Sequence, residues 1–195
     1  MDTLPSLKYF HKNKSHTLNV LLHWGGFDIE FDFMKQLFDL SKEKGRSVLS
    51  FNFPYMDRGE DSASKGLIEE SRALEAVLDL VRYELYTKIH LIGKSLGAIV
   101  AGRFLKYSSL DPEKYSITVL GYVLDDTDIK DFEGKITIIQ GSEDRFGNIL
   151  KVKEDMEDAK SLSIKYYEIE GADHSFRDPK GEYKYVDKAF EKIEF

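Results

Sequence analysis

The sequence of 195 residues contains no cysteine, four prolines and one tryptophan. Without cysteine the chain has no disulfide, no thiolate nucleophile, no cysteine-ligated zinc site and no cysteine-bound iron–sulfur cluster. It lacks an apolar run of about 18 residues that would span a bilayer. Residues 1–16 also lack the apolar segment of a signal peptide. We therefore expect a soluble, cytoplasmic protein that does not bind membranes.

An excess of positive charge is also missing. Lys and Arg number 28 against 35 Asp and Glu, for a formal net charge of −7. An acidic surface repels phosphate groups, which argues against nucleic acid as a partner. The 42% hydrophobic and 32% charged residues are typical of a globular protein. With no internal repeat and no linker rich in Pro, Gly or Ser, a single domain over residues 1–195 is predicted.

Short apolar runs rich in β-branched residues alternate with amphipathic segments, the pattern of repeated β-α-β units. Several runs are apolar throughout, as expected of parallel strands covered on both faces. The predicted fold class is α/β, a three-layer α/β/α sandwich around a mostly parallel sheet, in which ligands bind at the carboxyl ends of the strands. The expected strands are 18–24, 48–53, 89–92, 117–124, 136–139 and 164–169, and the expected helices are 31–44, 64–85, 96–107, 149–160 and 183–193.

The most specific motif is GKSLG, residues 93–97, between the expected strand 89–92 and helix 96–107. Gly-X-Ser-X-Gly at a strand-to-helix junction is the spacing of a nucleophile elbow. The two glycines leave room for a strained turn. This turn exposes the Ser95 hydroxyl and aims the amide of Leu96 at developing negative charge. Ser95 is the candidate nucleophile, and the alternative is a chance glycine-serine-glycine loop.

One of the five histidines, His174, is the candidate base. It stands in GADHSF just after the last expected strand, where it can take the proton of Ser95 and return it to a leaving group. The alternative for His174 is a solvated loop histidine. His90 lies in an apolar run and is expected to pack in the core, whereas His11 and His16 are expected to be solvated.

A carboxylate at a strand end between the serine and the histidine would orient the base. The segment GSEDRFG, after the next-to-last expected strand, offers Glu143 and Asp144. Asp144 is preferred because it stands one step before a change from loop to helix, where it can accept the imidazole N–H and fix its tautomer. Asp125 and Asp126, after the preceding strand, remain alternatives.

An oxyanion hole requires a second backbone N–H besides that of Leu96. The segment HWGG follows the first expected strand, and its glycines let the main chain approach a reacting carbonyl closely. Gly25 is the expected donor, with Trp24 and Gly26 as its neighbours. His23 is expected to support this loop rather than to act in catalysis.

The segments HWGGFD, FNFPYMDRGE, GKSLG, GSEDRFG and GADHSF together resemble the α/β-hydrolase superfamily over nearly the whole chain. The order Ser95, Asp144, His174 matches the order of triad residues in that superfamily. More narrowly, the segments are similar to a small branch without a cap domain. That branch is related to dienelactone hydrolases and includes hydrolase-like domains of a testis-expressed protein and a chromatin-complex subunit. The chain departs from it at Trp24, where relatives usually carry glycine. Dienelactone hydrolases use cysteine at the elbow, so Ser95 does not imply their activity.

No cap domain is expected, because the segment between the expected strands 117–124 and 136–139, where many related hydrolases insert one, is too short. The site should then be shallow and open to water. Arg58 and Arg145 lie near expected loop tips, where either can meet an acidic group of a substrate, the alternative being ordinary surface arginines. The resemblance places Tyr55 and Met56 near the mouth of the site, although core packing at a strand end is an alternative. The expected substrate-binding residues are Trp24, Tyr55, Met56 and Phe146.

These features predict a carboxylesterase-like serine hydrolase that needs no cofactor or metal and acts on small-molecule esters, or thioesters, through an acyl-enzyme. An alternative of another class is a non-catalytic scaffold of the same fold that serves interaction, since a fold does not imply a function. A third is metal-dependent hydrolysis through His23, Asp28, Asp173 and His174, although no ligand spacing such as HExxH is present. The sequence leaves the oligomeric state open.

Overall fold

The computed structural model describes residues 4–108 and 110–195, so residues 1–3 and 109 of the expected domain lie outside the described part. Within that part, seven strands form one sheet in the order β1-β3-β2-β4-β5-β6-β7. Only β1 is antiparallel to its neighbour, so the prediction of a mostly parallel sheet is confirmed. The strands are β1 (Leu7–Phe10), β2 (Thr17–Leu22), β3 (Ser47–Phe51), β4 (Lys88–Lys94), β5 (Tyr115–Leu120), β6 (Lys135–Gly141) and β7 (Ile164–Ile169).

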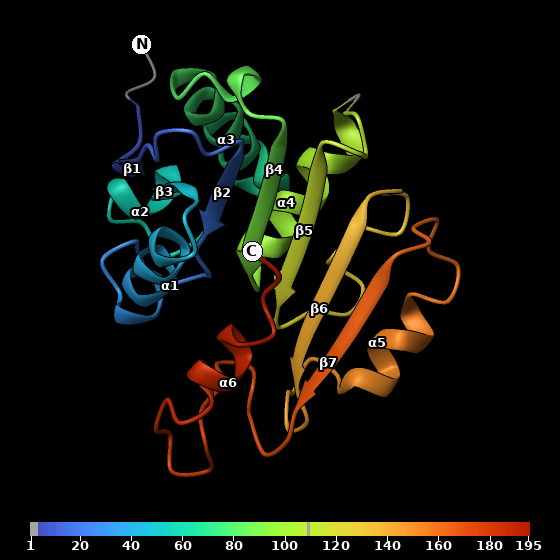
Figure 1. Cartoon of the computed structure of the whole chain (residues 1–195). Helices are drawn as coiled ribbons and strands as arrows, with labels where there is room; N and C mark the ends of the chain where they lie inside the picture. The colour runs from blue at the N-terminus through green and yellow to red at the C-terminus, as the bar shows by residue number, and fades with distance from the viewer. Residues whose placement is uncertain (1–3, 109) are drawn as a thin grey trace.

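Helices cover both faces of the sheet, which gives the predicted three layers (Figure 1). Two clusters of buried apolar side chains form the core, one packed under α3, α4 and α5 and the other under α1 and α6. The helices are α1 (Asp32–Glu43), α2 (Pro54–Asp57), α3 (Ile68–Leu80), α4 (Leu96–Tyr107), α5 (Ile149–Asp155) and α6 (Val186–Phe190), with short 3-10 turns at Lys65–Leu67 and Tyr83–Leu85.

The structure corrects several predicted boundaries. The strand expected over 117–124 ends at Leu120, because Gly121 adopts a φ of 75° and turns the chain away from the sheet. The helix expected over 64–85 is interrupted near both ends, where Leu67 and Arg82 take left-handed conformations with φ of 55° and 54°. Strand β1 was not predicted, because its four residues lie in a polar segment and alternate too briefly to give a pattern.

All the predicted site segments follow the carboxyl ends of parallel strands, which share one edge of the sheet. In Figure 1 the arrows of β2, β5, β6 and β7 point to this same edge. The loop between β5 and β6, residues 121–134, carries no helix, so the described chain has no cap at this position, as predicted. No helix in residues 4–108 and 110–195 has the length and apolar character needed to cross a membrane.

Candidate active site

Ser95 stands in a strained turn between β4 and α4, with φ of 49° and ψ of −112°. The glycines on either side are required by close contacts. A Cβ atom on Gly93 would lie 2.5 Å from the backbone N of Ala98, and one on Gly97 would lie 2.2 Å from the carbonyl oxygen of Leu22. Real side chains do not tolerate such contacts with backbone, so the motif forms the elbow for the steric reason expected from the sequence.

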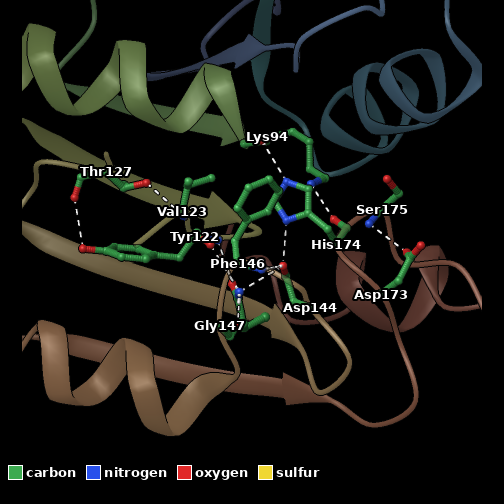
Figure 2. Close-up of polar contacts among 12 residues, drawn as sticks. Lys94, Tyr122, Val123, Thr127, Asp144, Phe146, Gly147, Asp173, His174 and Ser175 are labelled. Atoms are coloured by element: carbon green, nitrogen blue, oxygen red, sulfur yellow. Dashed lines mark hydrogen bonds and ion pairs between the residues drawn. The ribbon is translucent and has the colours of Figure 1, made fainter. Parts of the chain in front are cut away.

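Three side chains that are far apart in the sequence form one chain of hydrogen bonds at this edge. The Ser95 Oγ lies 2.8 Å from Nε2 of His174. Nδ1 of the same ring lies 2.7 Å from Oδ2 of Asp144, and Figure 2 shows this carboxylate beside the imidazole. His174 comes from the loop after β7 and Asp144 from the loop after β6. With Nδ1 donating to the carboxylate, Nε2 is free to accept the serine proton.

The carboxylate of Asp144 is held in place from two sides. Its Oδ1 accepts the backbone N–H of Phe146 at 2.8 Å, and its Oδ2 also accepts Nε2 of Gln140 at 2.9 Å. The side chain of Asp144 is fully buried. A buried carboxylate with these bonds has one orientation, and that orientation faces His174.

The other carboxylates considered from the sequence do not reach the imidazole. Asp125, Asp126 and Glu143 are all exposed, and in the described part of the chain none forms a hydrogen bond with His174. Among these candidates the structure therefore brings only Asp144 to the histidine.

The pKa of His174 lies below its ordinary value of 6.5, chiefly because the ring is largely buried. The hydrogen bond to Asp144 opposes this shift, whereas the positive charges of Lys94 and Arg145 add to it. The imidazole is consequently neutral at pH 7, which is the form that can accept a proton.

His23 holds the loop after β2 through two hydrogen bonds to the backbone. Its Nδ1 donates to the carbonyl oxygen of Trp24 at 2.9 Å, and its Nε2 accepts the backbone N–H of Phe53, also at 2.9 Å. Burial lowers the pKa of His23 to about 4, so the ring stays neutral and keeps this tautomer. His23 thus supports the loop, as expected, and both its nitrogens are occupied.

Two backbone N–H groups beside Ser95 are left without acceptors. In a trans peptide the C=O and N–H point to opposite sides, so the bond from His23 to the Trp24 carbonyl turns the N–H of Gly25 away from that ring. Neither Gly25 nor Leu96 donates its backbone N–H to any atom of the described residues. The two residues are neighbours, since a Cβ on Gly25 would lie 3.9 Å from Cδ2 of Leu96. They can serve as a pair of donors to a developing oxyanion.

Two of the four side chains expected to bind substrate are buried instead. The indole of Trp24 is 5% exposed and packs edge-on against Phe31 and Phe33 beneath the loop. Tyr55 is 1% exposed and its ring stacks with that of Phe53. Trp24 and Tyr55 are therefore not accessible to a substrate, because both rings pack in the aromatic core.

The other two candidates are half-buried. The centroid of the Phe146 ring lies 4.6 Å from that of the His174 ring. The guanidinium carbon of Arg145 lies 4.7 Å from the same Phe146 centroid. Met56 packs against the core cluster under α3 and α4. Arg58 forms ion pairs with Glu60 and Glu69, both at 2.7 Å, so it is a surface arginine held by carboxylates.

The remaining histidines and Asp173 take no part in this line of hydrogen bonds. His90 is buried and its Nε2 lies 2.8 Å from Oγ1 of Thr118, as expected of a core residue. His11 and His16 are exposed. The carboxylate of Asp173 pairs with Arg177 at 2.8 Å. Over residues 4–108 and 110–195, no group of three or more His, Asp or Glu side chains is placed to hold a metal ion.

Sequence reasoning missed two buried polar residues at this site. Gln140, at the end of β6, binds Asp144 and also donates to the carbonyl oxygen of Gly147 at 2.6 Å. Lys94 lies directly before the serine, and its Nζ donates to the carbonyl oxygen of His174 at 2.6 Å. The only signal in the sequence is that each is a long polar residue near the carboxyl end of a mainly apolar strand.

Comparison with known proteins finds one matching family and several solved structures of the same fold. Residues 15–193 match the family described as alpha/beta hydrolase domain. A search of the curated proteins finds no significant match. A protein of unknown function from Agrobacterium tumefaciens, described as an alpha/beta hydrolase, superposes with a TM-score of 0.76 at 22% identity, over 95% of this chain and 86% of that chain.

Two further solved structures are similar. A homologue of alpha-beta serine hydrolases from Coxiella burnetii has a TM-score of 0.74 at 16% identity, over 96% of this chain and 91% of that one. A serine hydrolase without a lid from Xanthomonas campestris has a TM-score of 0.71 at 18% identity, over 95% of this chain and 86% of that one. At these identities the likeness establishes a shared fold.

Proposed function

This chain belongs to the alpha/beta hydrolase family, and on that premise we propose that it is a serine hydrolase in which Ser95 is the nucleophile, His174 the base and Asp144 the group that orients the base. One observation carries the proposal. The serine hydroxyl, both imidazole nitrogens and a buried carboxylate form a continuous line of hydrogen bonds of 2.8 and 2.7 Å at the strand ends. Chance proximity does not also fix the tautomer that the chemistry requires.

Hydrolysis proceeds in two stages. In the first, Oγ of Ser95 attacks the acyl carbon while its proton moves to Nε2 of His174, and the leaving alcohol takes that proton as its bond to the acyl carbon breaks. In the second, water gives a proton to Nε2 and attacks the acyl-enzyme. The acid leaves and the proton returns to Ser95. Asp144 keeps its negative charge throughout and stabilises the imidazolium that forms in each stage.

The backbone N–H groups of Gly25 and Leu96 are proposed to bind the oxyanion of both tetrahedral intermediates. Both are without acceptors in the described chain, so they require no rearrangement when charge develops. Leu96 is the first residue of α4, whose N-terminus favours negative charge. Removing one such donor typically costs about 10²–10³ in kcat.

The proposed substrates are small-molecule carboxylic esters, or thioesters, with small or exposed acyl groups. The loop 121–134 carries no cap helix that would enclose a long acyl chain. The half-buried ring of Phe146, in contact with His174, offers a short apolar surface beside the reacting atoms. Among nitrophenyl esters of increasing chain length, short acyl groups are expected to give the highest kcat/KM.

A fluorophosphonate probe, which phosphonylates activated serines, tests the proposal. The native protein should be labelled, and Ser95→Ala should not. Ser163→Ala is the matched control, because Ser163 is an exposed serine just before β7, at the opposite edge of the sheet, and its replacement should leave labelling intact. A native protein that is folded but unlabelled would contradict the proposal and would favour the non-catalytic scaffold.

A further inference from the structure

Lys94 places a buried amine next to the backbone of His174, the proposed base. It is the last residue of β4 and directly precedes Ser95, yet its side chain is 1% exposed. The Nζ atom donates to the carbonyl oxygen of His174 at 2.6 Å (Figure 2). Within the described residues Lys94 forms no ion pair with a carboxylate within 4.0 Å. One hydrogen bond, made to the backbone of the base, is thus the main polar contact of this group.

Two aromatic rings lie near the amine, and the backbone at Gly121 approaches it closely. Its Nζ lies 5.8 Å from the ring centroid of Trp24 and 5.5 Å from that of Phe176. A Cβ on Gly121 would lie 2.7 Å from this Nζ and 3.0 Å from Cε1 of His174. The amine and the imidazole therefore share the space over Gly121, and the fold keeps a glycine there to admit both.

Burying an amine at this position is unfavourable for folding. Burial lowers the pKa of Lys94 to about 7, although the carboxylates of Asp144 and Asp173 partly oppose the shift. An unbranched apolar side chain such as methionine fits among aromatic rings without this penalty, and such replacements of buried charges are often neutral or stabilising. Packing alone does not account for a lysine here.

We propose that Lys94 is a positioning residue that ties the His174 loop to the nucleophile elbow and so holds the imidazole against the Ser95 hydroxyl. The proposal rests on the proposed function. Lys94 and Ser95 are consecutive in a strained turn, so one short segment fixes His174 twice, by its backbone carbonyl and by its ring. A displacement of about 1 Å between reacting groups can cost about 10²-fold in rate.

The charge of Lys94 has a second effect on the same histidine. When protonated, the amine opposes the imidazolium form and lowers the pKa of His174, as the charge of Arg145 also does, while Asp144 opposes both. Removing the amine should therefore raise the pKa of His174 and move the acid limb of the activity profile to higher pH.

Lys94→Met separates this role from a structural one. We expect kcat for a short-chain nitrophenyl ester to fall about 10–100-fold, KM to change little, and the acid limb of kcat/KM to move to higher pH. The melting temperature should stay equal or rise, because a buried amine is replaced by an apolar group. Lys88→Met, at the exposed opposite end of the same strand, is the matched control and should leave kcat unchanged.

Two results with Lys94→Met would overturn the inference. One is a folded variant with the kcat and acid limb of the native protein. The other is a kcat that falls only in step with the melting temperature, which would indicate a structural role. If the native protein itself is neither labelled by the fluorophosphonate nor active, the proposed function fails first, so the two failures are distinguishable.

The absence of cysteine from the chain allows a second variant. In Lys94→Cys the new thiol is the only one, and alkylation of the unfolded protein with 2-bromoethylamine followed by refolding gives a side chain of lysine length that ends in an amine. Alkylation with 1-iodopropane gives the same length without the amine. The aminoethyl form should recover kcat at least tenfold over the propyl form. Equal kcat in the two refolded forms would overturn the inference.

Discussion

Two sets of buried polar side chains, one around His174 and one between α1 and the sheet, differ in whether they have hydrogen-bond partners. Around His174 each has partners, as the bonds of Asp144 and Gln140 illustrate. Between α1 and the sheet, the side-chain amide of Asn19 and the hydroxyls of Ser50 and of Ser41, which belongs to α1 itself, are buried with no hydrogen-bond partner in the described chain. A satisfied network fixes orientations, whereas an unsatisfied group only costs stability. The first set should thus govern activity, and the second should govern stability alone.

The largest expected effect comes from Asp144→Asn. The amide keeps the shape but cannot fix the His174 tautomer in which Nε2 accepts the serine proton. We expect kcat to fall about 10³–10⁴-fold, the range for loss of a triad function, with the melting temperature nearly unchanged. Steady-state hydrolysis of a nitrophenyl ester and a thermal melt measure both. A loss below about tenfold would contradict the orienting role of Asp144.

Gln140→Met should affect both activity and stability, because Gln140 stands between the two roles. Its amide donates to Asp144 and Gly147, and its oxygen accepts the N–H of Tyr122 at 2.7 Å. Losing these hydrogen bonds leaves buried polar groups unpaired. We expect the free energy of unfolding to fall by about 2–3 kcal/mol and kcat to fall roughly tenfold. Urea unfolding and ester hydrolysis measure the two effects. Gln36→Met, on the exposed side of α1, is the control and should change neither.

The pH dependence of stability offers a smaller test at Lys94. Its pKa is about 7 in the folded protein, against an ordinary value of 10.5. Between these values the unfolded chain binds more protons, so this group makes the native protein more stable as pH rises through that window. Lys94→Met lacks this contribution, so its advantage in unfolding free energy should shrink from pH 7 towards pH 10. Urea unfolding at several pH values measures it, and a constant difference would contradict the buried amine.

The smallest effect is expected at Asn19. Leucine has nearly the same shape, and Asn19→Leu removes an amide whose two polar atoms lack partners. We expect the free energy of unfolding to rise by about 1 kcal/mol and kcat to stay unchanged, as measured by urea unfolding and ester hydrolysis. A loss of stability would show that Asn19 is satisfied after all, and a loss of activity would remove the distinction between the two regions.

The parts of the site that depend on local geometry were predictable from the sequence. The glycines at 93 and 97 are needed by contacts within one turn and its adjacent strand, so their spacing alone indicates the elbow. Asp144 and His174 were placed by a rule of topology, that parallel strands end at one edge. The sequence order of strands and helices was sufficient for that inference.

The parts that depend on side-chain direction were not predictable. Lys94 bonds across 80 positions of sequence to the backbone of His174, and no local pattern encodes such a contact. Trp24 and Tyr55 turn into the aromatic core rather than towards the site, a choice set by rings from several elements. Strand β1 is recognisable only through its partner β3, because its four residues, three half-buried and one exposed, carry no periodicity of their own.

Mapping the fluorophosphonate adduct tests whether the line of hydrogen bonds from Asp144 through His174 activates one particular hydroxyl. The folded native protein is treated with the probe, digested and sequenced by mass spectrometry. We expect a single modified residue, Ser95, in the peptide that spans the turn between β4 and α4. An adduct on any other residue, or none on the folded protein, would contradict this expectation.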